Sequence, residues 1–353
     1  MSRRVKVAVL MGGRSSEHEI SLASARSELD ALDPQRYETV TVEIGRDGRW
    51  ELEGGQNGAL AASGHASRPP LEPRPAETLP VPAAAQSPAA TLGAVDVVLP
   101  ILHGPFGEDG TVQGLLELAG VPYVGAGVTA SALCMDKDLF KAVMRDKGVP
   151  VTRSVTFRAG EAPENPFGYP VFVKPARLGS SVGITKAHDA DELSAAAALA
   201  LEHDDKILVE EFVDGVEVEC SVLGNRDPVV SLPGEIVSHG FGGADWYDYS
   251  AKYDEGGMDL VVPPRLPETT VERVRELALR SYVAADCEGM ARVDLFVRDG
   301  EVLVNELNTI PGFTATSVYA KLFEASGVTY AQLLDRLIEL ALERHDRRSK
   351  LKY

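Results

Sequence analysis

Acidic, amide and guanidinium side chains alternate with apolar ones in the stretch ARVDLFVRDGEVLVNELN, residues 291–308. The alternation predicts two strands joined by a tight turn at Asp299-Gly300. A two-residue turn there would place Asp294 opposite Asn305 and would leave Glu306 on the other face of the hairpin.

A three-residue loop over 298–300, with its glycine in the left-handed conformation, is the next most common connection. This register pairs Val297 with Glu301 and Arg292 with Glu306. It also collects apolar side chains on one face of the hairpin: Val293, Leu295, Val297, Leu303 and Leu307. Because side chains alternate along a strand, we favour this second register.

The opposite face would then carry Arg292, Asp294, Glu306 and Asn308. Carboxylate and amide oxygens without histidine or cysteine suit a hard cation such as Mg2+ or Mn2+. An adjacent arginine suits phosphate oxygens bridged to that cation. The alternative is a solvated strand face with an arginine–carboxylate pair. The turn that follows favours a site, because Gly312 lets the backbone approach a ligand closely.

A lysine followed by a loop of small residues occurs at 173–183, VKPARLGSSVG. Lys174 ends a short apolar strand, and the loop with Ser180 and Ser181 offers N–H groups of the kind that cradle phosphate. The pattern is not the GxxxxGK(S/T) of P-loop NTPases. An ordinary turn is the alternative, and it is the better interpretation when the loop is taken alone.

Three further charged residues lie on predicted elements. Lys137, in MDKDLFK, falls on a helix, where a solvated lysine is the usual alternative. Glu210 lies near the end of a strand predicted over 207–212, and Glu217 follows it. These two carboxylates could bind an adenine amino group and a ribose. For them the alternative is an edge strand with polar ends.

Two N-terminal loops carry the remaining candidates. Glu17 follows a strand and the Gly12-Gly13 turn, where a carboxylate can hold a substrate ammonium. His103 begins the loop HGPFGEDG, past the carboxyl end of a predicted strand. Ligands bind at such ends in doubly wound sheets, so we expect this loop to face a cleft.

A succession of predicted elements must position these side chains. A first, doubly wound unit is predicted by a buried strand over 5–11, a helix over 21–32, a hairpin over 40–53 and strands over 95–101 and 120–127. Further elements are predicted as a helix over 129–147, strands over 170–174, 207–212, 216–223 and 229–236, and helices over 269–285 and 330–344. The segment 55–93 is rich in Ala, Pro, Gly and Ser and predicts an insertion. The segment 240–258 is rich in Gly, Tyr and Asp and predicts a mobile loop.

Composition limits the classes of partner. The chain has 353 residues, 44% of them hydrophobic, which is enough for two or three domains. Its net charge of -18 argues against a nucleic-acid-binding surface. Cys134, Cys220 and Cys287 form no CxxC pair, which argues against a disulfide scaffold or zinc site and fits a reducing cytoplasm. No apolar run approaches the ~20 residues that span a bilayer, so we expect no membrane segment.

The order of these motifs is more specific than any one of them. The chain resembles the D-alanine–D-alanine ligases of the ATP-grasp superfamily throughout, except in the Pro/Ala-rich segment. The motifs that carry the resemblance are GGRSSEHEISL, HGPFGEDG, MDKDLFK, VKPARLGSSVGI, EEF with Glu217, YDYSAKY, ARVD and NELNTIPGFTATS. The resemblance implies an α/β fold with a Rossmann-like, doubly wound parallel-sheet domain over 1–125. A two-subdomain ATP-grasp fold with antiparallel sheets would follow, over 126–211 and 212–353.

The resemblance also implies the roles of residues around ATP. Lys137, Lys174 and Lys252 match ATP-site lysines, and Ser180 and Ser181 lie in the loop that closes over phosphate. Adenine and ribose would be bound by Glu210, Phe212, the Val213 backbone and Glu217. Two Mg2+ or Mn2+ ions would be held by Asp294, Glu306 and Asn308, in agreement with the hairpin face.

The implied amino-acid subsites lie on the other side of the phosphates. Glu17 matches the ligand of the first D-alanine's ammonium, and His103 lies beside it. Arg292 and the Gly312 N–H match the groups that hold the developing oxyanion. The second D-alanine would lie near Ser317, Val318 and Lys252. Tyr253, Ser180 and Glu17 match a hydrogen-bonded set that links the mobile loop to the other domains.

The implied activity is ATP-dependent synthesis of D-alanyl-D-alanine through a D-alanyl phosphate, for peptidoglycan precursors. The family further implies a cytoplasmic homodimer that binds D-alanine and ATP. Ligases that form D-alanyl-D-lactate or D-alanyl-D-serine, or that join another acid and amine, are alternatives. The Lys252-Tyr253 pair favours D-alanine as second substrate. A non-catalytic nucleotide-binding protein built on the Gly12-Gly13 unit is a further alternative, but a full GxGxxG is lacking.

Overall fold

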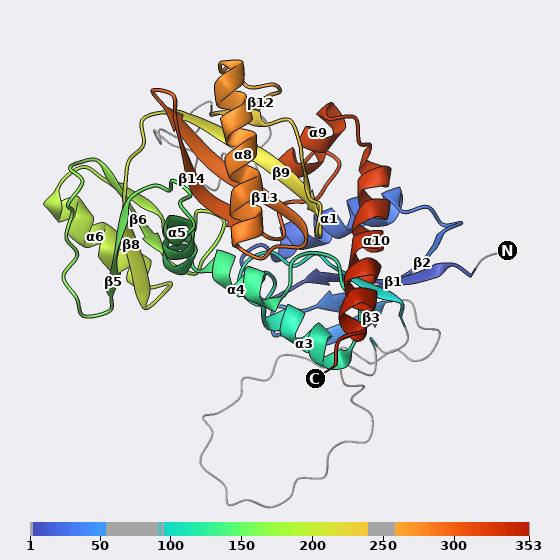
Figure 1. The fold of residues 1–353 in the computed structure, drawn as a ribbon. Coiled ribbons are helices and arrows are strands. Elements are labelled where there is room, and N and C mark those ends of the chain that lie inside the picture. Colours follow the sequence, from blue (N-terminus) through green and yellow to red (C-terminus); the bar gives the residue numbers. More distant parts are fainter. Residues whose placement is uncertain (1–2, 54–91, 93–94, 239–257, 353) are drawn as a thin grey trace, which may run out of the picture.

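A computed structural model describes residues 3–53, 92, 95–238 and 258–352 of the chain. The expected insertion over 55–93, apart from Leu92, lies outside the described residues. So does the expected loop over 240–258, apart from Met258, and with it the two candidate residues Lys252 and Tyr253. Three sheets with flanking helices are arranged side by side (Figure 1).

The N-terminal sheet confirms the predicted doubly wound unit. Its strands, in the order β3-β2-β1-β4, are β1 (Val5–Gly12), β2 (Tyr37–Ile44), β3 (Trp50–Glu53) and β4 (Val97–Pro100). β1 is parallel to both β2 and β4, and β3 is antiparallel to β2. The predicted turn between β2 and β3 is present, with Gly48 at a φ of +83°. The helices of this part are α1 (His18–Ala31) and α3 (Thr111–Ala119).

The strand predicted over 120–127 is wrong. Only Tyr123 pairs with β4, through a single parallel bridge to Val98. Gly120 and Gly125 bound the segment with φ of +67° and +96°, in the left-handed region that ends an extended run.

The single helix predicted over 129–147 is two helices, α4 (Val128–Met135) and α5 (Lys137–Asp146). Asp136 separates them with extended backbone, and its side chain accepts a hydrogen bond from the Leu139 N–H at 3.2 Å. Aspartate competes well for such N-cap positions, so this residue ends one helix and begins the next.

A second sheet, antiparallel throughout, forms the lobe at the left of Figure 1. Its strands, in the order β5-β8-β6-β7, are β5 (Ser154–Arg158), β6 (Val171–Pro175), β7 (Thr185–Ala187) and β8 (Lys206–Glu211). Helix α6 (Ala190–Leu201) covers one face, and its alanines pack on Val171, Val173 and Val209.

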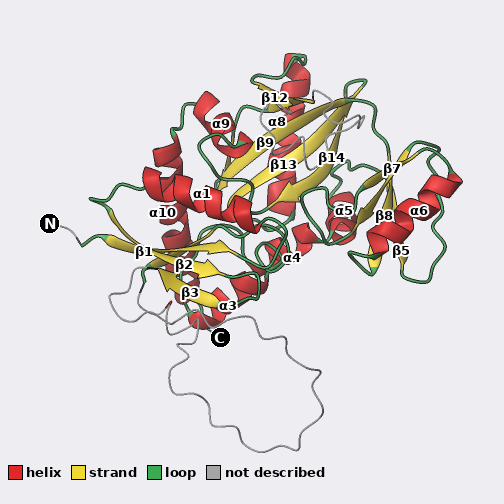
Figure 2. Ribbon diagram, turned by 180° about the vertical axis from the view of Figure 1, so that it is seen from behind, coloured by secondary structure: helices red, strands yellow, loops and turns green. Residues whose placement is uncertain are grey.

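The third sheet holds the predicted hairpin at its centre (Figure 2). Its strands are β9 (Val216–Gly224), β10 (Val229–Val230), β11 (Gly234–Ser238), β12 (Met258–Val261), β13 (Gly289–Arg298) and β14 (Glu301–Asn308). They are accompanied by α8 (Glu268–Ala284) and α9 (Val318–Ala325). The order β12-β11-β9-β13-β14 puts β13 between β9 and β14, so its side chains contact both neighbours.

The favoured hairpin register is wrong near the turn. Arg298 pairs with Glu301 across a two-residue Asp299-Gly300 turn. Both turn residues have positive φ, 52° and 81°, as this type of hairpin connection requires. Leu303 therefore lies opposite Phe296 rather than on the core face.

A β-bulge restores the predicted site face further along the hairpin. Leu295 pairs with Val304, but Asp294 pairs with Glu306, so Asn305 is an extra residue in β14. The shift also pairs Arg292 with Asn308. The four polar side chains thus share one face, as predicted, although by a different register.

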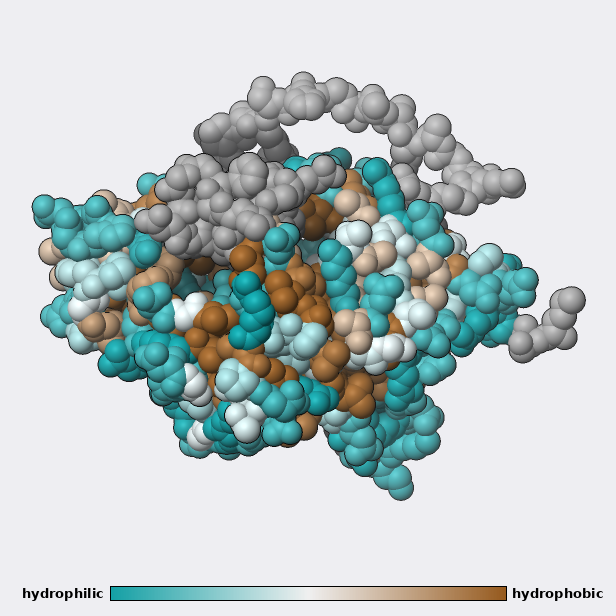
Figure 3. Space-filling model, turned by 90° about the horizontal axis from the view of Figure 1, so that it is seen from above, coloured by the Kyte–Doolittle hydropathy of each residue, from teal (hydrophilic) through white to brown (hydrophobic). Residues whose placement is uncertain are grey.

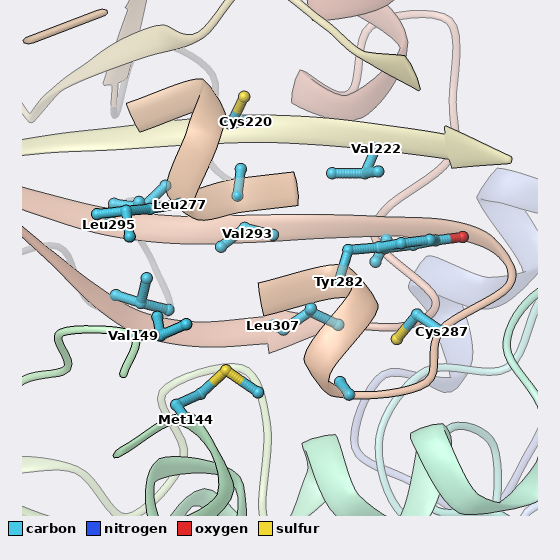
Figure 4. Close-up of a cluster of buried hydrophobic side chains, with 14 of the residues drawn as sticks. Met144, Val149, Cys220, Val222, Leu277, Tyr282, Cys287, Val293, Leu295 and Leu307 are labelled. Carbon is cyan, nitrogen blue, oxygen red and sulfur yellow. The ribbon is translucent and has the colours of Figure 1, made fainter. Parts of the chain in front are cut away.

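The core face of the hairpin packs against α8. Val293, Leu295 and Val297 of β13 are joined by Val302, Val304 and Leu307 of β14. Figure 4 shows Val293, Leu295 and Leu307 directed into one cluster with Leu277 and Tyr282. Burial of these aliphatic side chains fixes which face of the hairpin is left for chemistry.

Helix α10 (Tyr330–Ser349) returns from the C-terminal part to the N-terminal sheet, which the sequence did not predict. It runs past the blue strands in Figure 1, and its leucines share a core with Val7, Val9 and Val97. Arg344 is 4% exposed and donates hydrogen bonds to the Gly125 and Tyr123 carbonyl oxygens. This arginine fastens the helix to the segment that follows the single bridge.

Seen from above, hydrophobic residues gather near the middle of the surface and hydrophilic ones surround them (Figure 3). Within the described ranges, no helix combines the length and the apolar character needed to cross a bilayer.

Replacing Arg344 by methionine should lower the free energy of unfolding by about 2–4 kcal/mol, because two buried carbonyls would lose their donor. Arg348→Met is the matched control, since Arg348 pairs with Glu117 on the exposed side of the same helix. It should cost less than about 1 kcal/mol. Denaturant unfolding measures both, and equal effects would contradict the role given to Arg344.

Candidate active site

A cleft of about 460 Å³ lies between the second and third sheets. Its walls come from the β6–β7 loop, the end of β8 with the segment after it, β11, and the polar face of the hairpin. Candidate residues that line it are Lys137, Lys174, Ser180, Ser181, Glu210, Phe212, Val213, Glu217, Asp294 and Glu306. Elements far apart in sequence thus bring ten predicted positions to one cavity.

Two buried lysines hold Glu210 at the floor of the cleft. Lys174 Nζ lies 2.5 Å from Glu210 Oε1, and Lys141 contacts the other oxygen as well as Thr152. Burial alone would raise the pKa of Glu210, but the two ammonium groups outweigh it and lower the pKa to about 2. Glu210 is therefore an anion across the neutral pH range.

The two lysines differ in charge balance. Burial lowers the pKa of Lys141 more than Glu210 raises it. For Lys174, burial also lowers the pKa, but Glu210 and Glu306 together raise it above its ordinary value. Lys174 is thus a firm cation at the cleft, as a ligand of phosphate must be.

The small-residue loop has an unusual backbone. Ser180 and Ser181 have φ of 54° and 58°, a conformation that non-glycine residues rarely adopt outside functional loops. Lys137 donates to the Leu178 carbonyl oxygen at 2.7 Å and lies 3.4 Å from Glu306. Lys137 therefore ties this loop to the polar face of the hairpin.

Arg292, Asp294 and Asn308 form a connected cluster on that face. Arg292 donates two bonds of 2.7 Å to Asp294, and Asn308 Nδ2 donates to Asp294 at 3.0 Å. Arg292 Nε also lies 2.9 Å from Glu219, which is opposite Asp294 on β9. One guanidinium is thus shared between two buried carboxylates.

The donor set fits a hard divalent cation. Asp294 and Glu306 are directly opposite each other, and Asn308 lies one pair further along the same face. Because the Asn308 amide nitrogen is bound to Asp294, its oxygen is the atom left for a cation. The described residues contain no cluster of three His, Cys, Asp or Glu side chains suited to a metal, since the third donor here is an amide.

Aromatic rings line the end of the cleft away from the hairpin turn. Phe172 and Phe212 have ring centroids 6.1 Å apart, and Lys186 Nζ lies 4.2 Å from the Phe212 centroid. Val213 and Glu217 line the same end. A flat base can stack here, while both Glu210 oxygens already accept from lysines, which leaves one lone pair on each for an amino group.

A second group of candidates lies outside the large cleft. Glu17 and His103 are both buried, and Glu17 Oε2 is 3.0 Å from the position that a Cβ on Gly104 would take. Glu108 lies beside them and accepts a 2.9 Å bond from the Gly104 N–H. Burial, then the charge of Glu17, raise the pKa of Glu108 to about 8, although two backbone N–H groups oppose the shift.

The turn after β14 carries the last candidates. Ser317 Oγ accepts from the Thr314 N–H at 2.9 Å and lies 3.5 Å from a Cβ placed on Gly312. Ser317 precedes α9, and Val318 is its first residue. The two residues therefore face the glycine that is expected to bind an oxyanion.

Three functional side chains escaped the sequence reasoning: Lys141, Glu108 and Glu219. Each is a charged group buried among partners distant in sequence. Lys141 was visible in MDKDLFK four residues after Lys137, on the same helix face, and this spacing could have identified it. Glu219 was visible only as a carboxylate within an apolar strand.

Comparisons with known proteins agree with this geometry. A family model described as "D-ala D-ala ligase N-terminus" matches residues 6–126, and one described as "D-ala D-ala ligase C-terminus" matches residues 143–339. The D-alanine–D-alanine ligase A of Mesorhizobium japonicum is 46% identical, over 98% of this chain and 99% of that protein. The D-alanine–D-alanine ligase of Nocardia farcinica is also 46% identical, with the same two shares.

Solved structures show the same likeness. The D-alanine–D-alanine ligase of Coxiella burnetii is similar with a TM-score of 0.79 and 35% identity, over 99% of this chain and 97% of that one. The VanG D-Ala:D-Ser ligase of Enterococcus faecalis gives a TM-score of 0.78 at 34% identity, over 96% and 100%. A Bacillus anthracis D-alanine–D-alanine ligase complexed with ATP gives 0.75 at 27%, over 98% and 99%. The chain belongs to the D-alanine–D-alanine ligase family.

Proposed function

We propose that this enzyme joins two D-alanine molecules to D-alanyl-D-alanine and converts ATP to ADP and phosphate. The observation that carries the proposal is the single cleft in which Lys174, the 178–181 loop and the Asp294–Glu306 face converge. Cations and carboxylates on facing walls suit a nucleotide triphosphate with its metal. End-to-end similarity to D-alanine–D-alanine ligases supplies the substrate.

The first step activates a carboxylate. A carboxylate oxygen of the first D-alanine attacks the γ-phosphorus of ATP, the bond to the β,γ-bridging oxygen breaks, and D-alanyl phosphate and ADP form. Lys137 and Lys174 would offset the negative charge that gathers on the phosphates, and Ser180 and Ser181 would cover them. Glu17 would orient the substrate through its ammonium group.

We propose two Mg2+ or Mn2+ ions at Asp294, Glu306 and Asn308. When bound, they would bridge phosphate oxygens and withdraw charge from them. The pairing of Asp294 with Glu306 supports the placement, as does the choice of oxygen donors.

The second step forms the peptide bond. The amine of the second D-alanine, after losing a proton, attacks the acyl carbon, and the resulting oxyanion would be held by Arg292 and the Gly312 N–H. Phosphate then leaves with the electron pair of the broken C–O bond. Acyl phosphates hydrolyse, so the site must exclude water, and Ser317 and Val318 would help enclose the second substrate.

A D-alanyl-D-serine product is the second candidate, because a D-Ala:D-Ser ligase is among the structural relatives. The Lys252-Tyr253 pair favours D-alanine instead. We further propose a homodimer in the cytoplasm, where ATP is available. Light scattering during gel filtration tests the dimer, which would be contradicted by the mass of a single chain.

A substrate-competition assay decides the product. The enzyme, Mg2+ and ATP are given D-alanine alone, or D-alanine with D-serine or D-lactate, and ADP and the coupled product are quantified. We expect D-alanyl-D-alanine to dominate in every mixture. Predominant mixed product would assign the enzyme to the D-serine or D-lactate ligases, and absence of ADP release would reject the ligase function.

Lys141→Met should weaken both the fold and nucleotide binding. Removing one partner of a buried ion pair costs about 3–5 kcal/mol, and we expect the lower end because Lys174 still binds Glu210. Loss of one charge-assisted contact at Glu210 should raise the KM for ATP about tenfold. Lys147→Met is the control, since this exposed lysine pairs only with its neighbour Asp146 among the ion pairs of the structure's described part. An unchanged KM would refute the coupling.

A further inference from the structure

One peptide unit of the turn after β14 is held from both sides by the N-terminal part of the chain. The Ile310 N–H donates to Glu108 Oε2 at 3.3 Å, and the Ile310 carbonyl oxygen is 3.0 Å from His103 Nδ1. A carbonyl can only accept, so the His103 ring donates from Nδ1. Ile310 lies two residues before Gly312, so these two bonds fix the backbone that carries the Gly312 N–H.

Glu108 is fixed in turn by its own loop. Its other oxygen, Oε1, accepts the Gly104 N–H at 2.9 Å, so the carboxylate joins the 103–110 loop to the turn after β14. The same carboxylate borders the first amino-acid subsite, because Glu108 Oε1 and Glu17 Oε2 both lie 3.8 Å from a Cβ placed on Gly179. One side chain therefore contacts three pieces of the site: the ammonium subsite, the phosphate loop and the oxyanion turn.

We infer that Glu108 is a positioning residue for peptide-bond formation: with His103, it holds the Ile310 peptide so that the Gly312 N–H is directed at the oxyanion. The inference rests on the proposed function and adds the group that aims one of its donors. An oxyanion donor acts only when its hydrogen lies within hydrogen-bond distance of the developing charge, so a small displacement of the turn removes much of its effect. The first step, transfer of the phosphoryl group, does not use this donor.

The variant Glu108→Gln separates the two steps. Glutamine has a single accepting oxygen, and its NH2 group would face an N–H at either Gly104 or Ile310, so one of the two bonds is lost. D-alanyl phosphate should still form, while attack by the amine slows. We expect dipeptide formation to fall about 10- to 100-fold, with the KM for ATP unchanged. Hydrolysis of the waiting acyl phosphate should raise the ratio of ADP to dipeptide well above one.

Asp109→Asn is the matched control in the same loop. Asp109 accepts bonds from the N–H groups of Phe106 and Thr111, at 2.8 and 3.0 Å, and so stabilises the loop from within. It should lower the melting temperature without changing the ratio of ADP to dipeptide. A raised ratio in Asp109→Asn as well would overturn the inference, because general loosening of the loop would then suffice.

His103→Phe is a second test that does not depend on the folding of the first variant. It removes the donor to the Ile310 carbonyl and should raise the same ratio. Since both bonds hold one peptide unit, the double variant should show less than the summed effect. Ratios near one in both single variants, with wild-type enzyme producing dipeptide, would overturn the inference alone. Absence of dipeptide from the wild-type enzyme would instead overturn the proposed function.

Discussion

The extra residue in β14 determines where the chemistry of this protein can occur. Val302, Val304 and Leu307 must all face the core, and a regular strand, with its period of two, cannot place all three on one face. One inserted residue, Asn305, resolves the conflict. Without it Glu306 would be opposite Val293, among apolar side chains, where an unpaired carboxylate is very costly. The bulge therefore satisfies the core and aligns Glu306 with Asp294 through one local change.

Charge balance around this face follows from the same constraint. Aligning Asp294, Glu306 and the adjacent Glu219 concentrates negative charge on a protein that is already strongly acidic. Arg292 compensates two of these carboxylates directly, and Lys137 lies against the third. Lys174 and Lys141 serve Glu210 on the opposite wall. A metal–nucleotide complex can bind between such walls because each of its charges meets a fixed opposite charge.

Local patterns predicted much of this arrangement. Strand and helix positions followed from periodicity, and the polar face of the hairpin followed from alternation together with the types of its side chains. The errors share a cause, which is that a local rule competed with packing elsewhere. Alternation alone selected Leu303 for the core, and only the burial of Val302 and Val304 reveals the bulge. An uninterrupted apolar pattern hid the cap at Asp136 between α4 and α5.

Contacts between distant segments could not be predicted from one sequence. The packing of α10 on the N-terminal sheet and the pairing of Lys141 with Glu210 arise only when separate elements meet. The same holds for the bond from Ile310 to Glu108, which spans 202 positions. Motif order identified the family, whereas the groups that hold the motif residues in place required the folded chain.

Binding of Mn2+ in the presence of ADP tests most directly whether the bulged hairpin forms the metal site. Electron paramagnetic resonance of free Mn2+ gives the dissociation constant for the unaltered enzyme, for Glu306→Gln, and for Glu301→Gln at the exposed end of the same hairpin. We predict that Glu306→Gln weakens Mn2+ binding about 10- to 100-fold or more and that Glu301→Gln leaves it unchanged. Equal Mn2+ affinity in all three proteins would contradict the assignment of this face as the metal site.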